Sequence, residues 1–87
     1  MKNSEDFNFS KHSREQIKRR GLSKKVITDV VRSSEKTTTK EENVDVYQKI
    51  VKENNKPYLY RVFVNNTKTP PLIITAYKTS KTDKYEN

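Results

Sequence analysis

The chain contains no cysteine, which excludes disulfide bonds, thiol catalysis and thiolate metal sites. Its single histidine is His12, and one imidazole without any thiolate argues against a structural zinc site. No apolar run approaches the length of a membrane span, and no signal peptide precedes the first predicted helix. We therefore expect a cytoplasmic protein that uses no metal and no other cofactor.

Apolar residues are scarce as well. They make up 30% of the 87 residues, whereas typical domains hold roughly 45–50% when glycine is counted. They are concentrated in one helix-like and three strand-like segments, which favours a folded core over global disorder. We expect one domain over residues 1–87, with an ordered core at about 7–79 and flexible, charged ends that include residues 1–8.

The chain has only 11 acidic residues against 19 lysines and arginines, so its net charge is +8. A positive surplus of this size predicts polyanionic partners, namely RNA, DNA, an acidic protein or an anionic surface. Solubility alone is the simpler explanation for many of the lysines.

Two helices are predicted near the N-terminus. The first covers about residues 10–20, because Ser10 can cap its N-terminus and Gly21 can end it in the left-handed conformation. Ser23 can cap a second helix that runs from Lys24 to about Ser33. The apolar residues of this second helix form one stripe that faces a core.

Three strand-like runs follow a charged connector at residues 34–43, which holds at most a short edge strand near Thr37–Thr39. The runs are Val44–Val51, Tyr58–Val64 and Leu72–Thr79, and in the first two apolar residues recur with the period of a strand. We therefore expect an α+β fold in which two N-terminal helices pack on a three- to four-stranded antiparallel sheet.

The first helix carries a polar stripe beside its apolar side. Ser13 and Ile17 are predicted to point toward the sheet, while His12, Gln16 and Arg19 lie one step round the helix at i, i+4 and i+7. The positive end of the helix dipole near His12 favours a neutral imidazole, which can act as a base, and also attracts phosphate. A surface histidine without a role, or one that caps the helix, is the alternative.

Polar residues on the predicted strands add further candidates. Arg61 lies in mid-strand between apolar neighbours, where its charge needs a ligand or a partner such as Asp45 or Glu53. At the end of the last strand, a tyrosine can contact a phosphate, a ribose hydroxyl or a base, unless it only packs. The candidates there are Tyr77, Lys78 and Thr79.

The segments Phe9–Ser23 and Ile73–Thr79 resemble a known group of small prokaryotic domains of unknown function. Their pattern is roughly F-S-x-H-A-x-x-R-x-x-x-R-G-I-S, then a meander, then V-I-T-A-Y-x-T. That group is similar to the BrnT toxins and, more distantly, to the RelE/ParE superfamily of toxins. The resemblance covers about residues 7–79.

This resemblance implies a compact, metal-independent endoribonuclease toxin that is encoded with an antitoxin. The predicted catalytic residues are His12, Arg20, Arg61 and Tyr77. The predicted RNA- and phosphate-binding residues are Lys11, Gln16, Arg19, Lys78 and Thr79. The expected partners are RNA, an acidic antitoxin and, as an open alternative, the ribosome, with no membrane involved.

In the predicted mechanism, His12 or alternatively Tyr77 takes the proton of a ribose 2′-hydroxyl. The resulting alkoxide attacks the neighbouring phosphorus and leaves a 2′,3′-cyclic phosphate. Arg61, Arg20 and Lys78 stabilise the charge that develops on the phosphate.

Two positions depart from the pattern of the similar domains. Ser13 replaces a small alanine, and Gln16 stands where an arginine is common, which removes a cation. The second departure favours an alternative function, a basic module that binds nucleic acid without cleaving it. Two more alternatives are an interaction protein with an acidic partner and a ParE-like gyrase poison.

Overall fold

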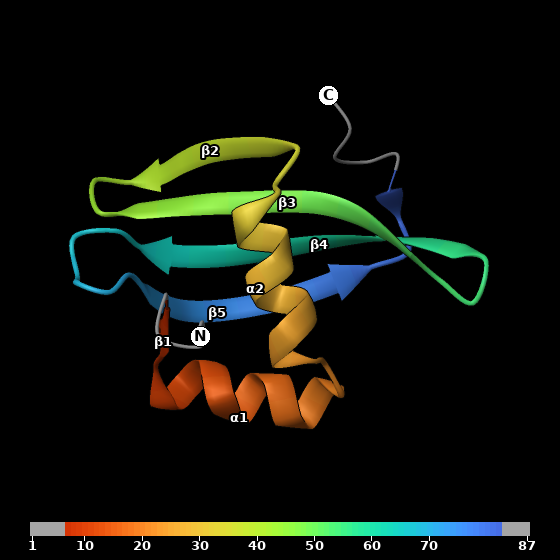
Figure 1. The fold of residues 1–87 in the computed structure, drawn as a ribbon, viewed down its shortest axis with the longest axis horizontal. Helices are drawn as coiled ribbons and strands as arrows, with labels where there is room; N and C mark the ends of the chain where they lie inside the picture. Colours follow the sequence, from red (N-terminus) through yellow and green to blue (C-terminus); the bar gives the residue numbers. More distant parts are fainter. Residues whose placement is uncertain (1–6, 83–87) are drawn as a thin grey trace.

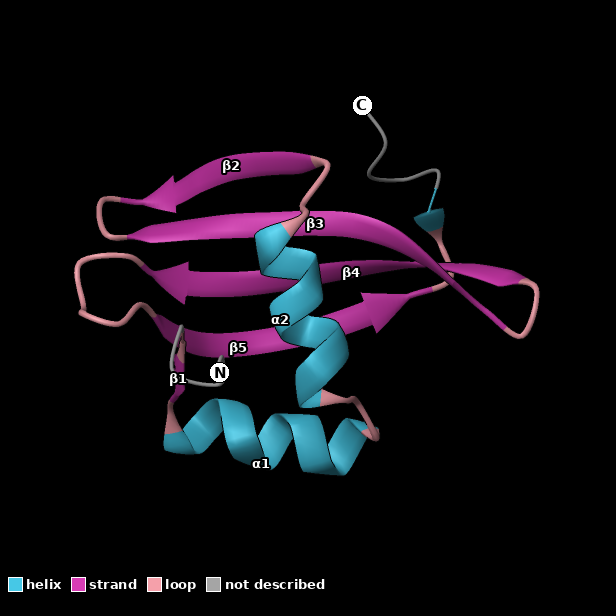
Figure 2. Cartoon of the chain, viewed as in Figure 1, coloured by secondary structure: helices cyan, strands magenta, loops and turns pink. Residues whose placement is uncertain are grey.

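The computed structural model describes residues 7–82. The elements in chain order are β1 (Asn8–Phe9), α1 (Lys11–Arg20), α2 (Lys24–Arg32), β2 (Lys36–Glu41), β3 (Val44–Glu53), β4 (Lys56–Asn65) and β5 (Leu72–Thr79). Two helices therefore precede most of the strands, as Figure 2 shows. The expectation of flexible ends concerns mainly residues 1–6 and 83–87, which lie outside the described part of the chain.

The sheet has five strands in the order β1-β5-β4-β3-β2. Strands β2 to β5 pair antiparallel with their neighbours, whereas β1 runs parallel to β5. The predicted three- to four-stranded antiparallel sheet is therefore wrong, because the sheet is five-stranded and mixed. The connector expected to hold at most a short edge strand forms the six-residue strand β2, and Asn8, expected to be loose, forms β1 together with Phe9.

Long-range hydrogen bonds explain why β1 forms in a polar, N-terminal segment. The backbone N–H of Asn8 donates to the carbonyl of Pro71 at 2.9 Å, and that of Ser10 donates to Ile73 at 3.0 Å. Strand β1 is therefore held by hydrogen bonds to residues 71–73, which are far away in the sequence. A pairing of this kind produces no local hydrophobic period from which it can be predicted.

The two helices begin and end where the capping residues predict. The Ser10 hydroxyl accepts a hydrogen bond from the N–H of Ser13 at 3.0 Å, and Gly21 has the left-handed φ of 67° that ends α1. Ser23 caps α2 in the same way. In Figure 1, α2 crosses one face of the sheet, while α1 lies along the β5 side.

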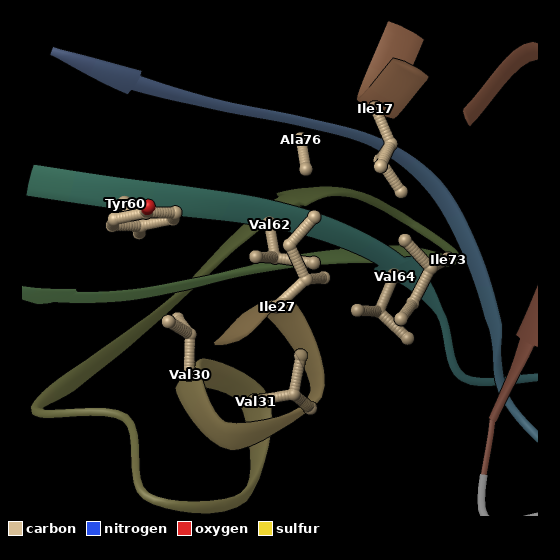
Figure 3. Close-up of a cluster of buried hydrophobic side chains, with 9 residues drawn as sticks. All are labelled: Ile17, Ile27, Val30, Val31, Tyr60, Val62, Val64, Ile73 and Ala76. Atoms are coloured by element: carbon tan, nitrogen blue, oxygen red, sulfur yellow. The ribbon is translucent and has the colours of Figure 1, made fainter. Parts of the chain in front are cut away.

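The hydrophobic core lies between α2 and that face of the sheet. Its members come from both helices and from β4 and β5, and Figure 3 shows the α2 side chains facing those of the strands. Alternate residues of β4 point into this core, so the intervening residues of the same strand point to the opposite face. The core residues are Ile17, Ile27, Val30, Val31, Tyr60, Val62, Val64, Ile73 and Ala76.

The opposite face of the sheet is crossed by neither of the two helices described here, and we call it the open face. Register places on it Val46, Gln48 and Ile50 of β3, Leu59, Arg61 and Phe63 of β4, and Thr75, Tyr77 and Thr79 of β5. Val46 and Leu59 are each only 2% exposed, so the floor of the open face is closely packed. The sequence alternation of β3 and β4 is thus confirmed, but both faces of these strands carry apolar residues.

Candidate functional site

The centre of the open face is a contact between Arg61 and Tyr77, which are paired directly across β4 and β5. A guanidinium nitrogen of Arg61 donates to the Tyr77 hydroxyl at 2.8 Å. The guanidinium carbon also lies 5.9 Å from the centroid of the Tyr77 ring. The sequence predicted both residues as functional, and the structure brings them together on the open face.

The two carboxylates considered as partners of Arg61 lie on the helix-covered side of the sheet. Asp45 is opposite Val64 and bonds Thr39 and Asn66. Glu53 is bonded by the hydroxyl of Tyr60 and by the ammonium of Lys78. Neither carboxylate therefore shares the open face with Arg61.

Phe63 extends the site along β4, because it is two residues after Arg61 and lies on the same face of the strand. Its ring centroid lies 6.2 Å from that of Tyr77, with 37° between the two planes, and the Arg61 guanidinium lies 5.7 Å from it. The ammonium of Lys40, on the edge strand, lies 5.6 Å from the same ring. Two cations of the open face, Arg61 and Lys40, therefore contact its aromatic rings: Arg61 lies near both rings and Lys40 near Phe63.

Phe63 and Lys40 were not predicted as site residues. A signal for Phe63 was present, because Arg61 and Phe63 are two apart in one strand and so must share a face. Lys40 carried no such signal, because its strand β2 is separated from β4 by β3. The contact between Lys40 and Phe63 depends on the order of the strands in the sheet.

The charges on the open face are mainly positive. Besides Arg61 and Lys40, register places Lys36 and Lys52 there, and the one strand carboxylate on this side is Glu41. On the strands, the other side carries Lys49, Lys56 and Lys78 together with the carboxylates Asp45 and Glu53, so its surplus of positive charge is smaller. This distribution attracts a polyanion to the open face.

Helix α1 borders the site along β5. The hydroxyl of Thr75 donates to the side-chain oxygen of Gln16 at 3.3 Å, which places Gln16 at the edge of the open face. His12 and Arg19 lie roughly 40° and 60° from Gln16 around the helix and are both exposed. The predicted stripe of these three residues therefore runs beside the open face, with Thr75 between it and Phe63.

Arg20 contacts the backbone of β5. Its guanidinium donates to the backbone carbonyl of Ala76 at 2.9 Å and so connects the end of α1 to β5 beside Tyr77. This makes Arg20 a positioning residue for the site. Lys11 lies roughly 140° from Gln16 around α1 and is exposed.

The two remaining candidates divide between the faces. Thr79 is on the open face, opposite Leu59, and its hydroxyl accepts from the N–H of Lys81 at 3.1 Å. Lys78 is opposite Tyr60 on the helix-covered side, where its ammonium bonds Glu53 at 2.8 Å. Because neighbouring strand residues point to opposite faces, Lys78 cannot join Tyr77 and Arg61 in one site.

The Lys78 ion pair belongs to a small polar cluster at the β3–β4 hairpin. The ammonium of Lys78 and the hydroxyl of Tyr60 both hydrogen-bond the Glu53 carboxylate and lower its pKa below the ordinary 4.5. Burial and the same carboxylate raise the pKa of Tyr60 far above its ordinary value. The cluster stabilises the fold and takes no part in the open face.

The described residues, 7–82, show neither a metal site nor a membrane-spanning helix. No group of three or more His, Asp or Glu side chains in this range is placed to hold a metal ion. Neither helix in the described part is long and apolar enough to cross a membrane.

Fold and site define a small α+β domain that presents a basic and aromatic sheet face. The chain belongs to the family described as Domain of unknown function (DUF4258), whose pattern matches residues 9–78. Comparison with curated proteins gave no match, and comparison with solved structures gave none either. The matched range begins in β1 and ends in β5, so it includes every element that borders the open face.

Proposed function

We propose that the protein binds RNA on its open face and cleaves it without a metal ion, as the toxin of a toxin–antitoxin system. The observation that carries this proposal is the Arg61–Tyr77 contact at the centre of a helix-free, basic face. The resemblance of Phe9–Ser23 and Ile73–Thr79 to BrnT-like and RelE-like toxins supports the same activity. A cytoplasmic location and an acidic antitoxin that covers this face belong to the proposal.

Arg61 and Tyr77 have complementary roles in this reaction. The guanidinium of Arg61 stabilises the negative charge that develops on the phosphate during attack. The Tyr77 hydroxyl accepts from Arg61, so its own proton remains available for the 5′-oxygen that leaves phosphorus. His12, on the α1 border of the face, takes the proton of the 2′-hydroxyl. The O2′–P bond forms while the P–O5′ bond breaks, leaving a 2′,3′-cyclic phosphate.

The test is cleavage of single-stranded RNA by the purified protein in EDTA, with analysis of the product ends. We expect cyclic phosphate ends from the parent protein. Arg61→Gln should reduce the rate by about 10²–10³, and His12→Ala by about 10²–10⁴. Tyr77→Phe is compared with Tyr58→Phe, which removes a hydroxyl from the other face of the sheet and should leave cleavage unchanged. Parent-like cleavage by all three site variants would refute the proposed site.

A second candidate function, RNA binding without cleavage, is favoured by the position of His12. Gln16, one helical turn after His12, already meets Thr75, and Tyr77 lies two residues farther along β5. The imidazole thus borders the face beside Thr75 instead of contacting the Arg61–Tyr77 pair. Retained RNA binding with no cleavage by the parent protein would support this second function.

A further inference from the structure

The two rings of the open face, Phe63 and Tyr77, lie on neighbouring strands at the surface of the sheet. Phe63 pairs with Thr75, two residues before Tyr77, so the rings are diagonal neighbours with centroids 6.2 Å apart. Both side chains are half-buried, so each ring keeps part of its surface exposed. Rings held this way on a sheet face are suited to stacking against nucleic-acid bases.

The two rings differ in what surrounds them. The hydroxyl of Tyr77 accepts a hydrogen bond from Arg61, at the place where the proposed reaction occurs. Phe63 has no polar atom of its own and lies one residue pair farther along the strands. A base on Phe63 would therefore be next to the phosphate held by Arg61.

Lys40 is the side chain that a base must replace on Phe63. Its ammonium lies 5.6 Å from the ring centroid, but the side chain is long and exposed, so it can move aside at little cost. After this movement the ammonium remains beside the strand and can contact a phosphate. The exchange of a cation–π contact for a stacked base thus retains the charge of Lys40 for binding.

We propose that the open face selects single-stranded over double-stranded RNA by stacking one unpaired base on Phe63. This inference rests on the proposed RNA-binding function and adds the structural class of the substrate. In a duplex the bases are stacked on one another, so the Phe63 ring cannot reach a base face unless the duplex opens. A binding surface built only from cations would favour the duplex, which carries the denser phosphate charge.

The experiment measures binding by fluorescence anisotropy with two probes. One is a short 2′-O-methyl single strand, and the other is the duplex that it forms with a complementary strand that is also 2′-O-methylated. Neither probe has a free 2′-hydroxyl, so neither can be cleaved by 2′-hydroxyl attack. We expect the parent protein to bind the single strand more tightly than the duplex. Phe63→Leu should weaken single-strand binding roughly fivefold to a hundredfold, the range measured for one stacked base, and leave duplex binding unchanged.

Matched variants on the other side of the sheet separate stacking from general effects. Tyr58→Leu removes a ring from the same strand on the helix-covered side, and should leave both affinities unchanged. Phe63→Tyr keeps a ring and should keep the preference for the single strand.

Two results would overturn this inference: duplex binding as tight as single-strand binding, or equal losses from Phe63→Leu and Tyr58→Leu. Its failure can be told apart from that of the proposed function. If the preference for the single strand and the effect of Phe63→Leu are found without any RNA cleavage, the stacking inference stands and the ribonuclease proposal falls. If cleavage depends on Arg61 but Phe63→Leu binds like the parent, only the stacking inference falls.

Discussion

Replacing Tyr60 by phenylalanine tests the polar cluster that closes the β3–β4 hairpin. Tyr60 is 1% exposed, and its hydroxyl donates to Glu53 at 2.6 Å. A hydrogen bond to a charged group contributes about 1.5–3 kcal/mol. The Glu53 side chain is 28% exposed, so water can replace the lost donor and the cost falls at the lower end, about 1.5 kcal/mol.

This loss of free energy of unfolding corresponds to a measurable change in melting temperature. A chain of 87 residues has an unfolding entropy of about 0.18 kcal/mol/K. Tyr60→Phe should therefore lower Tm by about 8 °C in thermal unfolding followed by circular dichroism. The control is Tyr58→Phe, on the same strand and face, which should lower Tm by less than about 3 °C.

The pH dependence of the same cluster gives the decisive comparison. Because Glu53 has a lowered pKa in the folded protein, its contribution is complete above pH 4.5 and is lost as the pH falls through the folded pKa. Because Tyr60 has a raised pKa, it disfavours the folded state once the pH exceeds its ordinary value of 10. The stability difference between the parent and Tyr60→Phe should therefore shrink in acid. A difference no larger than that of Tyr58→Phe, or one that stays constant down to pH 2, would refute the reasoning.

Three further predictions concern the elements that position the open face. Arg20→Met keeps the aliphatic stem but removes the hydrogen bond to β5, so it should lower the free energy of unfolding in urea by about 1 kcal/mol. The control Arg19→Met should lower it by almost nothing, and equal effects of the two variants would contradict the role of Arg20. Ser10→Ala removes the α1 cap and should cost about 1 kcal/mol, and an unchanged urea midpoint would show that the cap contributes nothing. Val62→Ala opens a cavity at a position with 0% exposure and should cost about 2–3 kcal/mol, measured as a lower midpoint with an unchanged m-value.

The helices and the strands β3, β4 and β5 follow from local signals, whereas strands β1 and β2 do not. Ser10, Ser23 and Gly21 mark the helix ends through their own side chains or backbone freedom, so the predicted boundaries hold to within one residue. Strand β1 has only two residues and forms because the opposite end of the chain lies beside it. Strand β2 is exposed at every position, so it shows no alternation of apolar and polar residues.

Local signals identify some residues of the candidate site, whereas others depend on long-range pairing of the strands. Arg61 and Tyr77 were selected by chemistry, and the antiparallel register of β4 and β5 then places them opposite each other. Lys78 and Tyr77 are adjacent in one strand, so the two-residue period of a strand places their side chains on opposite faces. The contribution of Lys40 depends on the sheet order and on the bulge between Thr39 and Glu41, which no local pattern reveals.

The most direct test of the proposed RNA site compares Arg61→Gln with Lys78→Gln. Each variant lowers the net charge from +8 by one unit, but the two cations lie on opposite faces of the same part of the sheet. The affinity for an uncleavable single-stranded RNA is measured for both variants at several salt concentrations. An RNA site on the open face predicts a loss of at least about tenfold for Arg61→Gln and less than about twofold for Lys78→Gln. Equal losses from the two variants would show that RNA is held by net charge alone and would contradict a site on the open face.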